Sequence, residues 1–179
     1  MVVEEQVKYW EVFDFEKHRQ VAIDQYRQVR PLYEDFCNVI KNLISHVLNA
    51  NRIKVHSIEA RAKTIESFGK KASSPSLDNL NAPKYRNPII DITDLAGVRV
   101  ITFYPSTQEK VDKILKEEFD IIELSDKAEL LIRDEKFGYA SIHYQVKLKA
   151  NRATLPEYNR FKDLIVEIQV RTILQHARA

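Results

Sequence analysis

The sequence predicts an α+β fold, an α/β sandwich in which a mixed sheet of about five strands is surrounded by helices. An apolar stripe with helical spacing runs through the first 50 residues. Short apolar segments typical of strands follow it, and a second helical pattern separates two of them. We therefore expect an N-terminal helical segment over residues 1–50 that packs on the sheet, and the sheet-forming unit over residues 51–179.

The N-terminal helical segment has a proline near its middle. Residues 15–30 and 31–50 are predicted to form two helices, or one helix kinked at Pro31, because proline is tolerated in a first helical turn and disrupts a helix further along. Apolar residues recur at intervals of three and four from Leu32 to Leu48. This stripe is typical of a helix that covers a sheet.

The later elements are predicted from periodicity and from their turn residues. An irregular connection over residues 73–88 holds three of the six prolines. Strands are expected at residues 53–60, 97–104, 119–124, 141–149 and 164–170. Helices are expected at residues 64–72 and 107–118, and a further helix begins at 172–179.

The composition limits the class of protein. The 179 residues are 44% apolar and 30% charged with a formal net charge of +2, which gives no bulk attraction to nucleic acid or to membranes. The single cysteine, Cys37, has no partner for an intramolecular disulfide, which favours a reducing compartment. No stretch approaches the roughly 20 apolar residues that cross a bilayer, and Met1–Trp10 lacks the core of a secretory signal. We expect a cytoplasmic protein that binds neither membranes nor nucleic acid.

A basic segment follows the first predicted strand. Arg61 and Lys63 share a strand face, and Ser67 and Lys71 share a helix face. Cations beside a helix start suit a polyphosphate. A solvated basic patch would produce the same sequence.

An acidic residue precedes the predicted strand at 97–104. A carboxylate such as Asp94 is costly near a buried strand unless it is paired or binds a cation. The alternatives are a helix cap and an ion pair with Arg99. Gly97 is one of only three glycines, and a scarce glycine usually marks a demand of the backbone.

Two further polar faces lie on the last predicted strands. Tyr139 and His143 share a face with Ser141 and could hold a base and a ribose, although a half-buried sheet face would look the same. The other face consists of Glu167, Gln169 and Arg171. Their long side chains suggest a polar cavity, and the alternative is a solvated sheet face.

The order of these segments resembles the synthetase domain of the RelA/SpoT family. The family's pattern is Arg-x-Lys, Ser-x-x-x-Lys, Asp-Leu-x-Gly-x-Arg, Gly-Tyr-x-Ser-x-His and Glu-x-Gln-x-Arg-Thr, and the chain shows all five in this order from about residue 53 onward. The resemblance implies a nucleotidyltransferase-like fold. It also implies transfer of pyrophosphate from ATP to the ribose 3′-hydroxyl of GDP or GTP, with AMP as the second product.

The resemblance implies a role for each motif residue. Mg²⁺ would be held by the catalytic residues Asp94 and Glu167, with Glu167 also acting as base or orienting acceptor. The residues implied to bind ATP are Arg61, Lys63, Ser67, Lys71 and Arg99, with the two arginines stacked on the adenine. The residues implied to bind the acceptor are Lys136, Tyr139, His143, Gln169 and Arg171, with Tyr139 stacked on the guanine.

Departures from the family's pattern keep two alternatives open. Lys136 stands three residues before Tyr139 instead of four, and Ala140 replaces a larger polar residue, so the acceptor could be an adenine nucleotide or the 3′ end of a tRNA. An inactive nucleotide-binding module is the other alternative, since we expect truncation at the C-terminus. No histidine is followed by aspartate, so we expect no hydrolase domain. A homo-oligomer is compatible with the resemblance.

Overall fold

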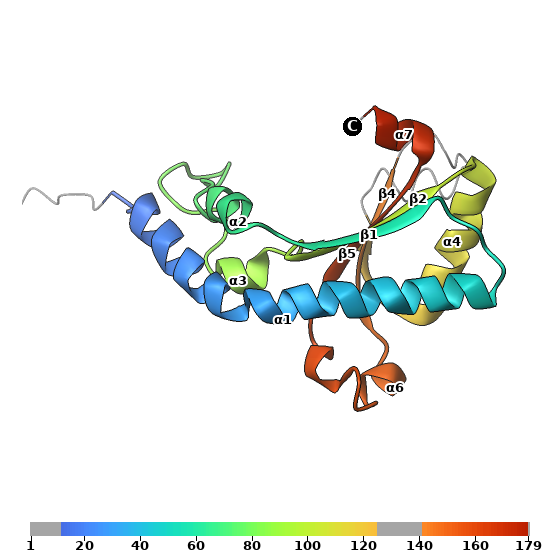
Figure 1. Ribbon diagram of the computed structural model, residues 1–179. Coiled ribbons are helices and arrows are strands. Elements are labelled where there is room, and N and C mark those ends of the chain that lie inside the picture. The colour runs from blue at the N-terminus through green and yellow to red at the C-terminus, as the bar shows by residue number, and fades with distance from the viewer. Residues whose placement is uncertain (1–11, 125–140, 179) are drawn as a thin grey trace, which may run out of the picture.

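A computed structural model describes residues 12–124 and 141–178 of the chain. Its helices are α1 (Phe15–Ala50), α2 (Ile65–Ala72), α3 (Pro88–Asp91), α4 (Pro105–Glu118), α6 (Ala150–Ala153), the 3₁₀ helix η1 (Asn159–Phe161) and α7 (Ile173–Ala177). Its strands are β1 (Ser57–Ala62), β2 (Ala96–Thr102), β3 (Phe119–Leu124), β4 (Ile142–Leu148) and β5 (Val166–Thr172). The mixed five-stranded sheet and the long N-terminal helix confirm the predicted α+β fold (Figure 1).

The strands form one sheet in the order β1-β2-β5-β4-β3. β2 and β5 are parallel neighbours, and the other three pairs are antiparallel. Two parallel strands begin at the same edge of a sheet. The residues that precede or open β2 and β5 therefore lie close together, although about 70 residues separate them along the chain.

The N-terminal segment is one helix, the second of the two alternatives for this region. Pro31 lies inside α1, which runs for 36 residues from Phe15 to Ala50. Buried residues occur on both sides of the proline, among them Tyr26 and Phe36. Packing of this continuous apolar face against the sheet and α2 outweighs the hydrogen bond that proline removes.

The predicted strand at residues 53–60 is displaced, because β1 runs from Ser57 to Ala62. The chain first has to leave α1: Arg52 has φ 56°, and the Ile53 N–H donates to the Leu48 carbonyl at 2.9 Å. Pairing with β2 begins only at Ser57. The last strand is displaced in the same direction, from the predicted 164–170 to 166–172.

The two faces of the sheet differ in character. α1 and α4 contact the sheet from one side (Figure 1), where Val98, Val100, Ile168 and Val170 are buried. Successive residues of a strand point to opposite faces of the sheet, so the residues that alternate with these four point to the other face. That face carries mainly polar side chains. In the part of the chain that the structure describes, no helix combines the length and apolar character needed to cross a membrane.

A buried polar contact joins α4 to the sheet. The Tyr144 hydroxyl on β4 donates to Oδ1 of Asp112 at 2.6 Å, and both residues are buried. Lys116 pairs with the other carboxylate oxygen at 3.0 Å. Tyr144→Phe removes a donor to a buried charge, so we expect the free energy of unfolding in urea to fall by about 2 kcal/mol. A double-mutant cycle with Asp112→Ala checks the contact, because zero coupling energy would show that the two side chains act independently.

Candidate active site

The strand registers bring polar residues from distant segments into two adjacent rows. Directly paired residues of neighbouring strands project from the same face of a sheet. One row on the polar face contains Arg61, Gly97 and Glu167. The next row contains Glu59, Arg99, Gln169 and His143. Both predicted Arg-x-Lys and Glu-x-Gln segments therefore contribute to one surface.

A pocket of about 320 Å³ opens on this face, which is within the size range of small-molecule sites. Six of the predicted site residues line it: Arg61, Lys63, Asp94, Arg99, Glu167 and Gln169. Glu59 and Gly97 also line it. The polar sheet face is therefore hollowed here, because residues of β1, β2 and β5 line a common cavity.

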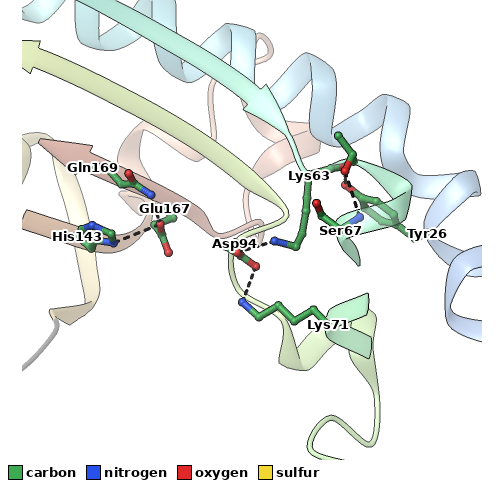
Figure 2. A network of polar contacts seen from close by, with 9 residues as sticks. Tyr26, Lys63, Ser67, Lys71, Asp94, His143, Glu167 and Gln169 are labelled. Carbon is green, nitrogen blue, oxygen red and sulfur yellow. Dashed lines mark hydrogen bonds and ion pairs between the residues drawn. The ribbon is translucent and has the colours of Figure 1, made fainter. Parts of the chain in front are cut away.

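Asp94 is held between two lysines (Figure 2). Lys63 Nζ donates to Oδ2 at 2.9 Å and Lys71 Nζ donates to Oδ1 at 3.0 Å. Burial alone would raise the pKa of Asp94, but the hydrogen bonds and charges of the two lysines outweigh it and lower this pKa. The alternative of an ion pair with Arg99 is not observed, because Arg99 contacts Glu59 at 3.4 Å.

The turn from β1 into α2 places both lysines. Lys63 follows the last residue of β1, and its N–H donates to the Leu95 carbonyl at 2.8 Å. Thr64 then caps α2 by accepting the Ser67 N–H at 3.2 Å. α2 packs closely on α1 at Gly69, where a Cβ atom would lie 2.7 Å from Cδ1 of Ile23. These contacts direct Lys71 back toward Asp94.

Glu167 is the second carboxylate of the pocket. His143 Nδ1 lies 3.5 Å from its Oε1, and Gln169 Nε2 donates to the same oxygen at 2.7 Å (Figure 2). The His143 contact is the main cause of a lowered pKa for Glu167, and Gln169 adds to it. Burial and the negative charge of Asp94 raise this pKa and oppose the effect. Glu167 and Asp94 line the same pocket.

Two carboxylates that line one pocket are a donor set that a divalent cation can use. Both side chains line one pocket, and both are ionised at neutral pH because folding lowers pKa values that already lie well below 7. Among residues 12–124 and 141–178, no three His, Cys, Asp or Glu side chains gather as a metal site. Mg²⁺ commonly binds through one or two carboxylates plus substrate phosphates and water, so two carboxylates are a sufficient protein contribution.

Arg171 lies beside the pocket without lining it. Its side chain is buried, with 8% of the residue exposed. Burial is the largest cause of its lowered pKa, the charge of Arg99 acts in the same direction, and Glu59 opposes them. Arg171 pairs with Ile101 of β2 and follows Gln169 on the same face of β5.

Three other predictions have different outcomes. Ser67 is exposed on α2 and does not line the pocket. Lys136 and Tyr139 lie outside the described residues. The expectation that Gly97 meets a backbone demand is wrong, because an added Cβ would make only an ordinary contact, 3.5 Å from the Arg61 carbonyl oxygen. Gly97 instead leaves the floor of the pocket without a side chain.

Sequence reasoning missed Glu59. This residue contacts Arg99 at 3.4 Å and His176 of α7 at 3.9 Å. The available signal was its spacing, because Glu59 stands two residues before Arg61 and therefore shares its strand face.

Both carboxylates connect the stability of the fold to pH. A carboxyl group whose pKa is lowered by folding stabilises the protein above its ordinary pKa, and that contribution is lost as the pH falls through the lowered value. The ordinary values are 3.8 for Asp94 and 4.5 for Glu167. We expect the free energy of unfolding in urea to fall with acidification below pH 4.5. Asp94→Asn and Glu167→Gln should each flatten this dependence, and an unchanged acid dependence in both variants would contradict the assignment.

The fold and pocket define an α+β protein with a charged pocket, in which cationic side chains and carboxylates line one cavity. The family profile described as "Region found in RelA / SpoT proteins" matches residues 60–179. The chain therefore belongs to the RelA/SpoT family, as its motifs indicate. Comparison with curated proteins gives no match.

Solved structures of low sequence identity share the fold. Small alarmone synthetase 1 from Bacillus subtilis is 19% identical with a TM-score of 0.62, over 86% of this chain and 74% of that chain. A GTP pyrophosphokinase family protein from Streptococcus pneumoniae is 20% identical with a TM-score of 0.61, over 86% and 72%. Small alarmone synthetase 2 from Bacillus subtilis is 22% identical with a TM-score of 0.61, over 86% and 75%.

Proposed function

We propose that this protein transfers pyrophosphate from ATP to the 3′-hydroxyl of GDP or GTP, producing (p)ppGpp and AMP. The observation that carries the proposal is the location of two ionised carboxylates, Asp94 and Glu167, in one pocket, where two lysines donate hydrogen bonds to Asp94. Family membership supports the same reaction class. Solved structures of this fold include small alarmone synthetase 1 bound to its product pppGpp and the same protein bound to AMPCPP.

The donor half of the pocket is proposed to bind ATP. Arg61 and Arg99 would stack on the adenine, because planar guanidinium groups stack well on aromatic rings. Lys63 and Lys71 would hold the phosphates, with Ser67 nearby on α2. In the free protein these ammonium groups neutralise Asp94. When phosphates take over the ammonium groups, the Asp94 oxygens become available to a cation.

Magnesium bound by Asp94 and Glu167 would supply neutralisation of charge on the phosphate oxygens. Glu167 has a further task, because one of its oxygens is already oriented by Gln169 and His143. As an ionised carboxylate it can accept or orient the proton of the acceptor 3′-hydroxyl. That oxygen attacks the β-phosphorus and AMP leaves, so catalysis consists mainly of alignment and charge stabilisation.

The acceptor half is proposed to use His143, Gln169 and Arg171 together with Lys136 and Tyr139. Tyr139 would stack on the guanine base. His143 and Gln169 both contact Glu167, so an acceptor held by them would lie next to the proposed base. An acceptor ribose held there would bring its 3′-hydroxyl toward Glu167.

A radiolabel assay tests the proposed reaction. The purified protein is incubated with Mg²⁺, GDP or GTP, and ATP labelled in the β-phosphate, and we expect a labelled tetra- or pentaphosphate product. A parallel panel contains AMP, ADP and tRNA as acceptors. If product forms only with an adenine nucleotide or with tRNA, that molecule replaces GDP or GTP as the proposed acceptor. Tight binding of an ATP analogue without product from any acceptor would indicate an inactive nucleotide-binding module.

A further inference from the structure

The main-chain carbonyl of Lys63 accepts two hydrogen bonds from α1. The Tyr26 hydroxyl donates to it at 2.6 Å, and Arg30 Nε donates to it at 3.0 Å. Tyr26 and Lys63 meet where α1 passes the turn between β1 and α2 (Figure 2). This contact links the N-terminal helix directly to a residue that lines the pocket.

Both donors are held in place by their own neighbours. Tyr26 is fully buried, and its ring stacks on Phe68 of α2 with 4.3 Å between the ring centroids. The guanidinium of Arg30 pairs with Glu34 one helical turn further along α1. Burial raises the pKa of Tyr26 to about 12, further above the neutral range in which a tyrosine hydroxyl is protonated and can donate.

The opposite side of Lys63 is also fixed. Its N–H donates to the carbonyl of Leu95, the residue that follows Asp94, and its Nζ donates to Asp94 itself. Lys63 is therefore clamped between α1 and the segment that enters β2. Its main chain has little freedom, which limits where its ammonium group can reach.

We propose that Tyr26 and Arg30 are positioning residues that place the Lys63 ammonium group for the donor phosphates. The inference rests on the proposed function and extends it to α1. Both residues precede residues 60–179, the part of the chain that the family profile matches. Neither contacts the nucleotide in this proposal, because each acts through the Lys63 carbonyl.

Tyr26→Phe tests the role, because it keeps the ring on Phe68 and removes only the hydroxyl. We expect the Kd of a non-hydrolysable ATP analogue with Mg²⁺ to rise roughly three- to tenfold by calorimetry, the equivalent of one lost hydrogen bond. Tyr33→Phe is the matched control. Tyr33 lies on the same helix, 6.5 Å from Tyr26 between ring centroids, and no hydrogen bond of its hydroxyl is found among the described residues. Its substitution should leave the Kd unchanged.

Arg30 provides a second variant with its own rescue. Arg30→Met removes the donor and should weaken binding of the analogue to a similar extent. Arg30→Lys restores a positive donor at the same position and should recover part of the affinity. Equal losses of analogue affinity in the Met and Lys variants would contradict a role for the hydrogen bond that residue 30 donates to the Lys63 carbonyl.

Amide hydrogen exchange separates positioning from general destabilisation. In Tyr26→Phe the Lys63 amide, which donates a hydrogen bond to the Leu95 carbonyl, should exchange faster. The exchange rates of the β5 amides should not change. Faster exchange throughout the sheet, or an analogue affinity equal to that of Tyr33→Phe, would overturn the positioning role and leave the proposed function intact. Failure of the wild-type protein to bind the analogue would overturn both.

Discussion

Glu167→Gln is expected to reduce pyrophosphate transfer by roughly 100- to 10,000-fold, the usual contribution of a positioned acid or base. The amide has the same shape as the carboxylate and remains next to Gln169 and His143. It cannot accept a proton, and it has no charge to offer to a metal ion. Affinity for an ATP analogue without metal should change little, because Glu167 does not contact either lysine of the donor half.

The measurement is initial-rate formation of labelled product with saturating ATP, Mg²⁺ and GDP. Glu109→Gln is the matched control, since Glu109 lies on α4, forms an exposed pair with Lys113 and does not line the pocket. It makes the same chemical change away from the pocket and should retain wild-type activity. Transfer by Glu167→Gln within a few-fold of the wild-type rate would remove Glu167 from the catalytic centre.

Asp94→Asn is expected to reduce transfer by roughly 100-fold or more, because a carboxylate ligand and its charge are lost from the site of phosphate chemistry. The same change has an opposite effect on binding. Lys63, Lys71 and Asp94 together carry a net charge of +1, and removal of the one negative charge leaves +2. Without magnesium, the variant should therefore bind an ATP analogue at least as tightly as the wild-type protein does.

Calorimetry with EDTA measures this binding, and the radiolabel assay with Mg²⁺ measures transfer. Asp35→Asn is the matched control, because Asp35 forms a 2.6 Å ion pair with Arg160 that is half exposed and remote from the pocket. It should alter neither quantity. Weaker metal-free binding by Asp94→Asn would show that the lysines depend on Asp94 for their position, contrary to the charge argument.

Local sequence patterns were sufficient where a segment's own periodicity decides its structure. The helix predicted at residues 64–72 is α2, which runs from Ile65 to Ala72 after its Thr64 cap, and β3 has the predicted bounds of Phe119 and Leu124. The error at β1 arose because the chain between Asn51 and His56 is shaped by its exit from α1. A few apolar residues in that connection imitated the alternation of a strand.

The motifs identified most of the pocket residues but not their partners. Asp94 was weighed as a partner of Arg99, yet the turn after β1 brings Lys63 and Lys71 to it instead. Glu59 forms the ion pair with Arg99 because the antiparallel register of β1 and β2 places the two residues directly opposite each other. A register is a long-range property, and spacing along a single strand does not contain it.

The sequence by itself determined the fold class, the family and the residue types available for polyphosphate chemistry, because periodicity and motif order are local in the chain. Only the tertiary structure decided which of these groups meet. Asp94 and Glu167 line one pocket because β2 and β5 are parallel neighbours that begin at the same edge of the sheet. Tyr26 reaches Lys63 because α1 packs across the turn into α2. In both cases distant segments pair because their apolar faces become buried against each other. Burial of apolar area depends on the whole chain and not on any one segment.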